Sequence, residues 1–276
     1  MNRSFRASVV SLTPVLVSVL FGVLCTLVIK ASPLEFYQIT PFSENSFGFF
    51  ASFANGFYFV VLAGVGATII YLLLRRKSHR LVTLLIGFAL TMAVFVLSFF
   101  YLSVIAAIFD VPYEDVTTLT LSVFATIVAD YALFKTNGKL ASITILGIGG
   151  GLGAFLGLSI PTASTVLILI FLAFYDVFAV YRGPVGKIAN IGLDQLRGLS
   201  LSFKEVQIGL GDFTFYSMLS GHMLLNYGYV PGLASIIGIA VGCVLSFKML
   251  EKKGMFPGLP LPIFLGLAAS FIVSFV

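Results

Sequence analysis

The sequence has no tryptophan, only 2 histidines and 2 cysteines, and few charged residues. Charged residues make up 10% of the chain, against about 25% in an average soluble domain, and this excludes an ordinary water-soluble globular protein. Cys25 and Cys243 both lie inside apolar runs. Their placement excludes a disulfide framework, a zinc site and a Cys-x-x-Cys redox pair.

Apolar residues dominate what is present. Hydrophobic residues make up 59% of the 276 residues, and the mean hydropathy is +1.09. This balance indicates an all-α protein that crosses the membrane several times. Roughly 20 apolar residues cross the hydrocarbon core of a bilayer. We therefore predict nine transmembrane helices, over about 9–29, 50–74, 81–108, 116–134, 140–158, 162–182, 207–226, 231–249 and 259–276.

The distribution of lysine and arginine predicts how these helices are oriented. If the N-terminus is cytoplasmic and the helices alternate in direction, all 16 lysines and arginines except Lys30 fall on the cytoplasmic side. Such an excess of basic residues is typical of cytoplasmic loops, so we predict an external C-terminus in a multi-pass protein of the cell membrane. The net charge of +5 then reflects topology and contact with anionic membrane lipid. No basic–aromatic pattern indicates nucleic-acid binding.

The longest polar interruption covers residues 183–206. It separates a six-helix part, residues 1–182, from a three-helix part, residues 207–276, within one integrated membrane domain. On the predicted topology it is a cytoplasmic loop. Its mixture of apolar and charged residues indicates that it lies on the membrane surface or docks there.

Two aspartates lie inside predicted transmembrane helices. Asp176 precedes the end of the sixth helix by about six residues, and Asp212 follows the start of the seventh by about five. At 1.5 Å per residue, both carboxylates would lie roughly 8–9 Å inside the cytoplasmic boundary. Because an ionisable group at bilayer depth is costly, such residues mark a functional site.

The chemistry of two neighbouring carboxylates follows from their charge. At hydrogen-bonding distance they cannot easily both ionise, so the pair would hold one shared proton. The ionised member could take a proton from water while the protonated member polarises a peptide carbonyl. Such peptide hydrolysis needs no metal, so we expect no cofactor. The same residues could instead serve a proton-coupled transporter or a cation leak channel, and the residues alone leave both open.

The residues near the aspartates suit an extended peptide. Gly209 and Gly211 lack Cβ atoms beside Asp212 and would let a substrate backbone approach closely. The prolines of 257–262 remove N–H donors and predict irregular backbone at the start of the ninth helix. Irregular backbone at membrane depth is tolerated only against protein or a wet cavity. Strand-like pairing there could hold an unwound substrate.

Three motifs carry a resemblance to a known family. Tyr175-Asp176, Gly209-Leu210-Gly211-Asp212 and the Pro-Leu-Pro turn at 260–262 resemble the presenilin and signal peptide peptidase family of intramembrane aspartyl proteases. Residues 209–217 are closer to the presenilin branch, and the chain resembles the archaeal presenilin homologues. The resemblance implies a Gly-x-Gly-Asp aspartic endopeptidase with Asp176 and Asp212 as its catalytic pair. It also implies single-pass transmembrane proteins or signal-peptide-like segments as substrates, and it leaves a homo-oligomer open.

The resemblance also implies which residues would contact the substrate. The family's Pro-Ala-Leu-Pro segment reads Leu259-Pro260-Leu261-Pro262 here, so its last two positions match and its first two do not. This departure concerns specificity more than activity. Together with Gly209, Leu210 and Gly211, the segment is the predicted substrate-binding set. Tyr175 is predicted to hydrogen-bond near the pair.

Other conspicuous residues are predicted to be structural. Gly149, Gly153 and Gly157 are spaced four apart, which favours close helix packing over a dinucleotide fingerprint. His222 lies ten residues beyond Asp212, about 15 Å along a helix, too far to serve the pair directly. We expect it to be packed or hydrogen-bonded. Asp130 is predicted to be interfacial.

Overall fold

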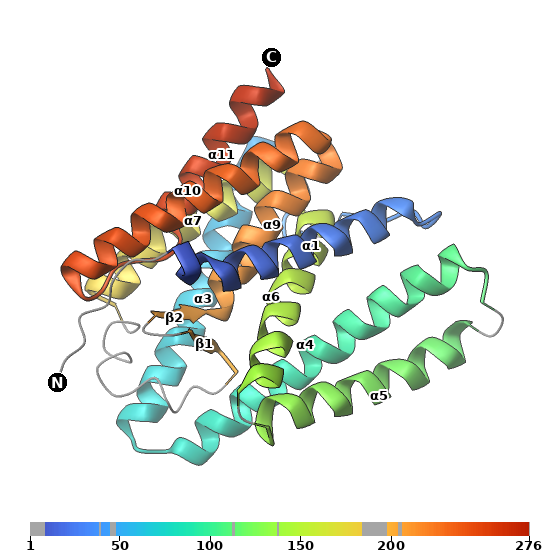
Figure 1. The fold of residues 1–276 in the computed structure, drawn as a ribbon, viewed down its shortest axis with the longest axis horizontal. Coiled ribbons are helices and arrows are strands. Elements are labelled where there is room, and N and C mark those ends of the chain that lie inside the picture. The colour runs from blue at the N-terminus through green and yellow to red at the C-terminus, as the bar shows by residue number, and fades with distance from the viewer. Residues whose placement is uncertain are drawn as a thin grey trace.

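The computed structural model describes residues 9–38, 40–44, 48–111, 114–136, 138–183, 198–203 and 206–275. Within these ranges a short 3-10 turn, Val9–Leu12, precedes nine α-helices and one β-hairpin (Figure 1). The nine predicted helices are thereby confirmed. They are α1 (Thr13–Ala31), α3 (Phe49–Arg75), α4 (His79–Ile108), α5 (Glu114–Phe134), α6 (Lys139–Ser159), α7 (Thr162–Tyr181), α9 (Leu210–Asn226), α10 (Tyr229–Lys253) and α11 (Pro260–Ser274).

Seven of these helices are long and apolar enough to cross a membrane, namely α1, α3, α4, α5, α6, α7 and α10. The two shorter helices are α9, with 17 residues, and α11, with 15. Large apolar side chains remain exposed along α3, α4 and α5, as expected where the surrounding solvent is lipid. The chain is therefore a multi-pass membrane protein. The direction in which its helices cross the membrane stays a prediction.

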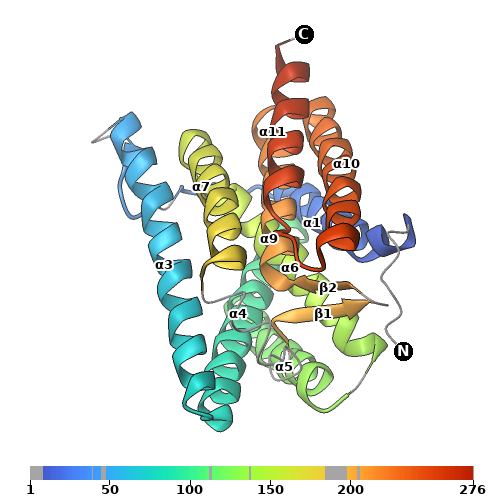
Figure 2. The same ribbon diagram turned by 90° about the vertical axis from the view of Figure 1, so that its left-hand side faces the viewer.

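Helix α9 occupies the centre of the bundle. It packs against α1, α6, α7, α10 and α11 (Figure 2). Between Phe213 and Leu224 every residue of α9 except Phe215 is buried. A short helix can be held at the centre in this way because protein, and not lipid, surrounds it on most sides.

Three glycines of α6 set the distance to α9. A Cβ atom on Gly149 would lie 2.6 Å from Cβ of Phe213, and one on Gly157 would lie 2.9 Å from the Met218 carbonyl oxygen. A Cβ atom on Gly153 would overlap the Thr214 carbonyl oxygen. Hydrogen atoms in place of side chains let the two backbones approach this closely. The predicted packing role of these glycines is confirmed.

The segment predicted as a cytoplasmic loop contains a hairpin. Strand β1 (Ser200–Phe203) pairs antiparallel with β2 (Val206–Gly209). The predicted start of the seventh helix at 207 is therefore wrong, because helix α9 begins only at Leu210. Val206 and Ile208 are buried while Gln207 is exposed, and this alternation has the period of a strand. Residues 184–197 and 204–205 of the predicted loop lie outside the described residues.

His222 and Asp130 both form hydrogen bonds that join neighbouring helices. His222 is fully buried, and its ring nitrogens lie 2.7 Å from the Gly157 carbonyl oxygen and 3.1 Å from the Thr162 hydroxyl. The expectation of a hydrogen-bonded histidine is confirmed. Asp130 accepts a hydrogen bond of 2.7 Å from the Thr91 hydroxyl. This bond joins α5 to α4, a structural use of the carboxylate.

Glu44 joins the N-terminal ends of α3 and α7. Its carboxylate accepts the Ser164 N–H at 3.0 Å, the Ser164 hydroxyl at 2.6 Å and the Ser52 hydroxyl at 2.7 Å. The Asn55 amide donates to the Ser164 hydroxyl and to the Phe42 carbonyl, both at 2.9 Å. A carboxylate at the start of a helix satisfies N–H groups that the helix leaves free.

The α6–α9 contact predicts the effect of adding one methyl group. Gly153→Ala forces the α9 backbone away and should destabilise the protein by about 1–3 kcal/mol, lowering its melting temperature in detergent. Gly147→Ala is the matched control on the same helix, because its Cβ would meet only Phe21, at 3.9 Å. Equal melting temperatures for the two variants would contradict the proposed close contact.

The Glu44 contacts predict a pH-dependent stability. Burial acts to raise the pKa of Glu44, but hydrogen bonds from Ser164 and Ser52 outweigh it and hold the pKa below its ordinary value. A lowered pKa in the fold gives stability that is complete above the unfolded pKa of about 4. That stability is lost as the pH falls through the folded pKa.

Glu44→Gln should therefore cost roughly 1 kcal/mol at pH 7, measured by thermal unfolding in detergent. The difference from wild type should narrow as the pH is lowered from 7 towards 3, because protonation of the wild-type carboxylate weakens the same hydrogen bonds. Glu35→Gln changes an exposed glutamate of the same connection and should have no effect. A difference that is equally large at both pH values would argue against the carboxylate.

Candidate active site

Asp212 is the third residue of α9, and its position is set by the preceding strand. Strand β2 ends at Gly209, whose backbone is extended, and the helix begins at the next residue. The Gly209 N–H donates to Asp212 Oδ2 over 3.3 Å. This local bond, and the partial positive charge at a helix N-terminus, favour a carboxylate at this position.

Asp176 approaches from a different helix. It lies on α7, five residues before the helix ends at Tyr181. Its Oδ2 accepts the backbone N–H of Leu259 over 3.0 Å. This bond ties α7 to the segment that connects α10 with α11.

Gly258 brings the two carboxylates together. A Cβ atom on Gly258 would lie 2.8 Å from each carboxylate oxygen of Asp212. The next residue, Leu259, donates its N–H to Asp176. Because consecutive Cα atoms lie 3.8 Å apart, the two aspartates contact adjoining points of one backbone. The structure therefore places both predicted residues beside the Gly258–Leu259 dipeptide.

Tyr216 fixes this dipeptide on its other side. It lies one helical turn after Asp212 and is buried, and its hydroxyl donates to the Gly258 carbonyl over 2.8 Å. Gly258 therefore accepts from Tyr216 while its Cα faces Asp212. The sequence could have suggested Tyr216, because it lies four residues after Asp212 and residues i and i+4 share one face of a helix. Apart from its place among prolines, nothing in the sequence marked Gly258 as a residue of the site.

The segment after Gly258 differs from its prediction. Helix α11 begins at Pro260, so the prolines at 260 and 262 start a regular helix and do not prevent one. Within the predicted stretch 257–262, the expectation of irregular backbone holds only for residues 257–259. The physical reason is that N–H groups in the first turn of a helix have no internal partner, so proline loses nothing there.

Contacts between α10 and α11 hold this segment in place. Pro262 packs directly against Gly242, where a Cβ atom would overlap the Pro262 Cα. A second glycine one turn earlier, Gly238, meets the Leu265 carbonyl in the same way. The position of Gly258 and Leu259 is thus fixed by a backbone contact close behind them.

A small cavity borders Asp212, with a volume of about 70 Å³. Here it is called the Asp212 cavity. It lies between β2, α9, α10 and the residues before Gly258. Its lining consists of Val15, Val206, Gln207, Ile208, Asp212, Tyr216, Cys243, Ser246, Phe247, Leu250, Phe256 and Gly258.

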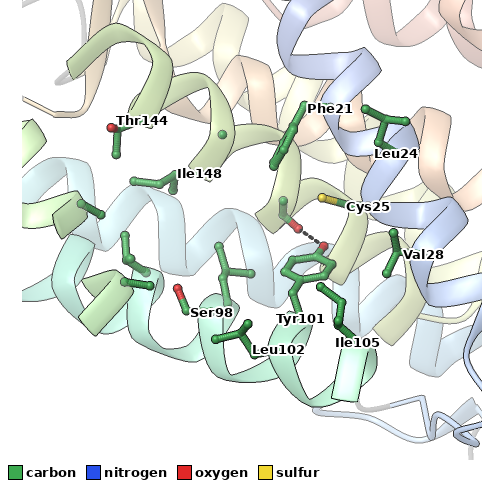
Figure 3. A pocket seen from close by; sticks show the side chains of 16 residues that line it. Phe21, Leu24, Cys25, Val28, Ser98, Tyr101, Leu102, Ile105, Thr144 and Ile148 are labelled. Atoms are coloured by element: carbon green, nitrogen blue, oxygen red, sulfur yellow. Dashed lines mark hydrogen bonds between the residues drawn. The ribbon is translucent and has the colours of Figure 1, made fainter. Parts of the chain in front are cut away.

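A much larger cavity lies elsewhere, between α1, α4, α5 and α6 (Figure 3). Its volume is about 540 Å³, and apolar side chains form nearly all of its lining. Tyr101 crosses it, and the Tyr101 hydroxyl donates to the Gly151 carbonyl over 2.7 Å. The lining contains no carboxylate and no histidine. Of these two cavities, only the Asp212 cavity is lined by a carboxylate, that of Asp212.

The remaining predicted site residues have different surroundings. Gly211 is exposed, and a Cβ atom there would meet only Phe215, at 3.7 Å. Leu210 is 9% exposed and belongs to the core, so we expect only its backbone to be available to a substrate. Leu261 is partly buried. The predicted substrate contacts of these residues stay predictions.

Tyr175 does not make its predicted hydrogen bond. Its hydroxyl is buried, and no described residue serves as its partner. The ring instead faces α3, where a Cβ atom on Gly64 would lie 3.6 Å from the hydroxyl oxygen. The side chain points toward α3 because Asp176, its neighbour in sequence, occupies the face of α7 toward Leu259. Among the described residues, no group of three or more His, Cys, Asp or Glu could hold a metal ion.

No protein-family model matches the chain. Over 135 aligned positions it is 30% identical to Presenilin-B of Dictyostelium discoideum, a match that covers 42% of this chain. The match spans 28% of the length of that relative.

The fold matches the solved structure of a presenilin family intramembrane aspartate protease. The TM-score is 0.64, with 96% of this chain and 97% of that chain covered, at 18% sequence identity. The predicted resemblance to the presenilin family is thus confirmed in sequence and in fold. The catalytic assignment of Asp176 and Asp212 stays a prediction.

Proposed function

We propose, from this presenilin-like fold, that the chain is an intramembrane aspartic endopeptidase. The observation that carries the proposal is the contact of both Asp176 and Asp212 with the Gly258–Leu259 dipeptide. Two membrane-embedded carboxylates from different helices converge there, within reach of a cavity. Acid–base hydrolysis needs such an arrangement.

The proposed reaction uses one ionised and one protonated aspartate. The carboxylate takes a proton from water, and the water oxygen attacks the carbonyl carbon of the peptide. The protonated aspartate donates its proton to the carbonyl oxygen, which gives a tetrahedral diol. When the C–N bond breaks, the aspartate that took the proton from water gives it to the nitrogen, and the other aspartate takes a proton from a diol hydroxyl. The products are a carboxylic acid and an amine, and the pair again holds one proton.

The proposed substrates are single-pass transmembrane segments or signal-peptide-like segments. A helical substrate hides its peptide bonds in its own hydrogen bonds, so it must unwind before hydrolysis. The β1–β2 hairpin leads directly into Asp212, and an unwound segment could pair with its edge. The exposed backbone at Gly211 would leave room for that segment. Leu259 to Pro262 would border it on the other side.

The transporter alternative has no specific support. Both related proteins are presenilins by name, and one is described as an aspartate protease. A transporter and a protease still predict opposite results for the same variants. One experiment therefore separates them.

Asp176→Asn and Asp212→Asn should each abolish cleavage of a tagged single-span substrate, by at least about 1000-fold in kcat. Each variant keeps the size of the side chain but removes the carboxylate. Asp130→Asn is the matched control, since Asp130 is also helical but bonds only to Thr91 among the described residues. Its activity should be unchanged. Fragments are mapped by mass spectrometry, and circular dichroism checks that every variant is folded.

Absence of cleavage by folded wild-type protein, across several substrates and lipids, would overturn the protease proposal. Ion flux into proteoliposomes that depends on Asp176 and Asp212 would then establish the transporter.

Gly258→Ala tests the geometry without removing an acid. The new methyl group would press on the Asp212 carboxylate and displace it. Because a shift of about 1 Å in a catalytic group can cost 100-fold, we expect kcat to fall by roughly that factor. Gly66→Ala is the control, because a Cβ atom there has no neighbour within 4 Å. Full activity in Gly258→Ala would contradict the proposed role of this contact.

A further inference from the structure

The Asp212 cavity offers a buried hydroxyl to whatever occupies it. Ser246 of α10 is 5% exposed, and its side chain lines the cavity. No described residue provides a hydrogen-bond partner for its hydroxyl. A buried hydroxyl without a partner is costly and rare in native proteins. We therefore expect a small polar molecule in the cavity that forms a hydrogen bond with the Ser246 hydroxyl.

The volume and the polar lining of the cavity fit a water molecule. A water molecule needs a polar site with room for about one probe sphere, of roughly 10–15 Å³, and the cavity has about 70 Å³. It also needs two to four polar partners. Ser246, Asp212 and Tyr216 all border this space.

The hydrogen-bonding capacities of these three groups are complementary. The Tyr216 hydroxyl donates its proton to the Gly258 carbonyl, so its oxygen can only accept a further bond. The Asp212 carboxylate also accepts. Ser246 is free to donate. A water molecule that donates to Asp212 and Tyr216 and accepts from Ser246 would satisfy all of them.

We propose that the Asp212 cavity holds the water that Asp212 activates, and that Ser246 positions this water. The inference rests on the proposed protease function for the use of the water, but not for its presence. Ser246 acts here as a positioning residue, because it touches the water and not the aspartates. Water would arrive from the side of the exposed Gln207, where the cavity meets the hairpin.

The two cysteines of the chain test whether water occupies the cavity. Cys243 lines the Asp212 cavity and is 2% exposed, whereas Cys25 lines the apolar cavity and is 8% exposed. Hydrogen peroxide resembles water in polarity and oxidises thiols that it can reach. Because the two thiols have different surroundings, each one is compared with itself in the wild type and in the variant. The probe is therefore hydrogen peroxide on the full-length protein in detergent, with each cysteine read by mass spectrometry.

The proposal predicts that peroxide oxidises Cys243 in the wild type although this residue is only 2% exposed. Ser246→Val fills the cavity with methyl groups and should largely abolish the oxidation of Cys243, with the rate of Cys25 unchanged. A Cys243 rate unchanged by Ser246→Val, or an equal slowing of Cys25, would overturn the water-filled cavity.

Kinetics test the role of Ser246 in cleavage. Ser246→Ala removes one hydrogen bond to the water and should lower kcat about tenfold, with KM unchanged. Ser246→Thr keeps the hydroxyl and should restore most of kcat. Ser235→Ala is the control on the same helix, since the Ser235 hydroxyl donates to Gly232 of its own helix. Wild-type kcat in Ser246→Ala would overturn the positioning role.

The oxidation experiment and the kinetic experiment test separate parts of the proposal. If the wild-type protein cleaves nothing, the proposed function fails, and the oxidation rates still decide whether the cavity holds water. If the wild-type protein and Ser246→Ala cleave the substrate equally fast, the protease function is supported and the proposed role of Ser246 is wrong. A changed KM with unchanged kcat would also count against Ser246, because it would place the residue in substrate binding.

Discussion

The close approach of α6 to α9 is the contact on which the rest of the structure depends. Glycines at 149, 153 and 157 let the two backbones touch, and this holds a 17-residue helix in the middle of the bundle. A helix of that length that begins beside a strand could not sit in lipid alone, because unpaired backbone groups are costly there. The position of Asp212, at the start of α9, follows from this contact.

A second backbone contact places the other half of the site. Gly238 and Gly242 of α10 receive α11, and this positions the preceding Gly258 and Leu259. Asp176 and Asp212 then reach the same dipeptide from α7 and α9. In both contacts, glycine allows a packing distance that any other residue would prevent. The helix bundle brings the two carboxylates together.

The sequence predicted some elements well and others poorly, for identifiable reasons. The nine helices could be predicted because a long apolar run is by itself the sequence signal of a helix that is buried in lipid or protein. The hairpin at 200–209 was missed because a strand of four residues shows few periods of alternation, and its neighbours are polar. The prolines at 260 and 262 were misjudged because their effect depends on whether they fall at the start of a helix or within it. Tyr175 was misjudged because sequence adjacency to Asp176 does not determine the direction of a side chain.

The sequence by itself determined the class of protein, its number of helices and its family resemblance, because composition, apolar run length and the Gly-Leu-Gly-Asp motif are local properties. It also placed both aspartates near helix ends. Only the tertiary structure decided that Asp176 and Asp212 contact adjoining residues, that Gly258 lies between them, and that Ser246 borders the same cavity. These residues come from three helices and one connection, separated by up to 83 positions between Asp176 and Leu259. Their meeting depends on packing distances that no local pattern contains.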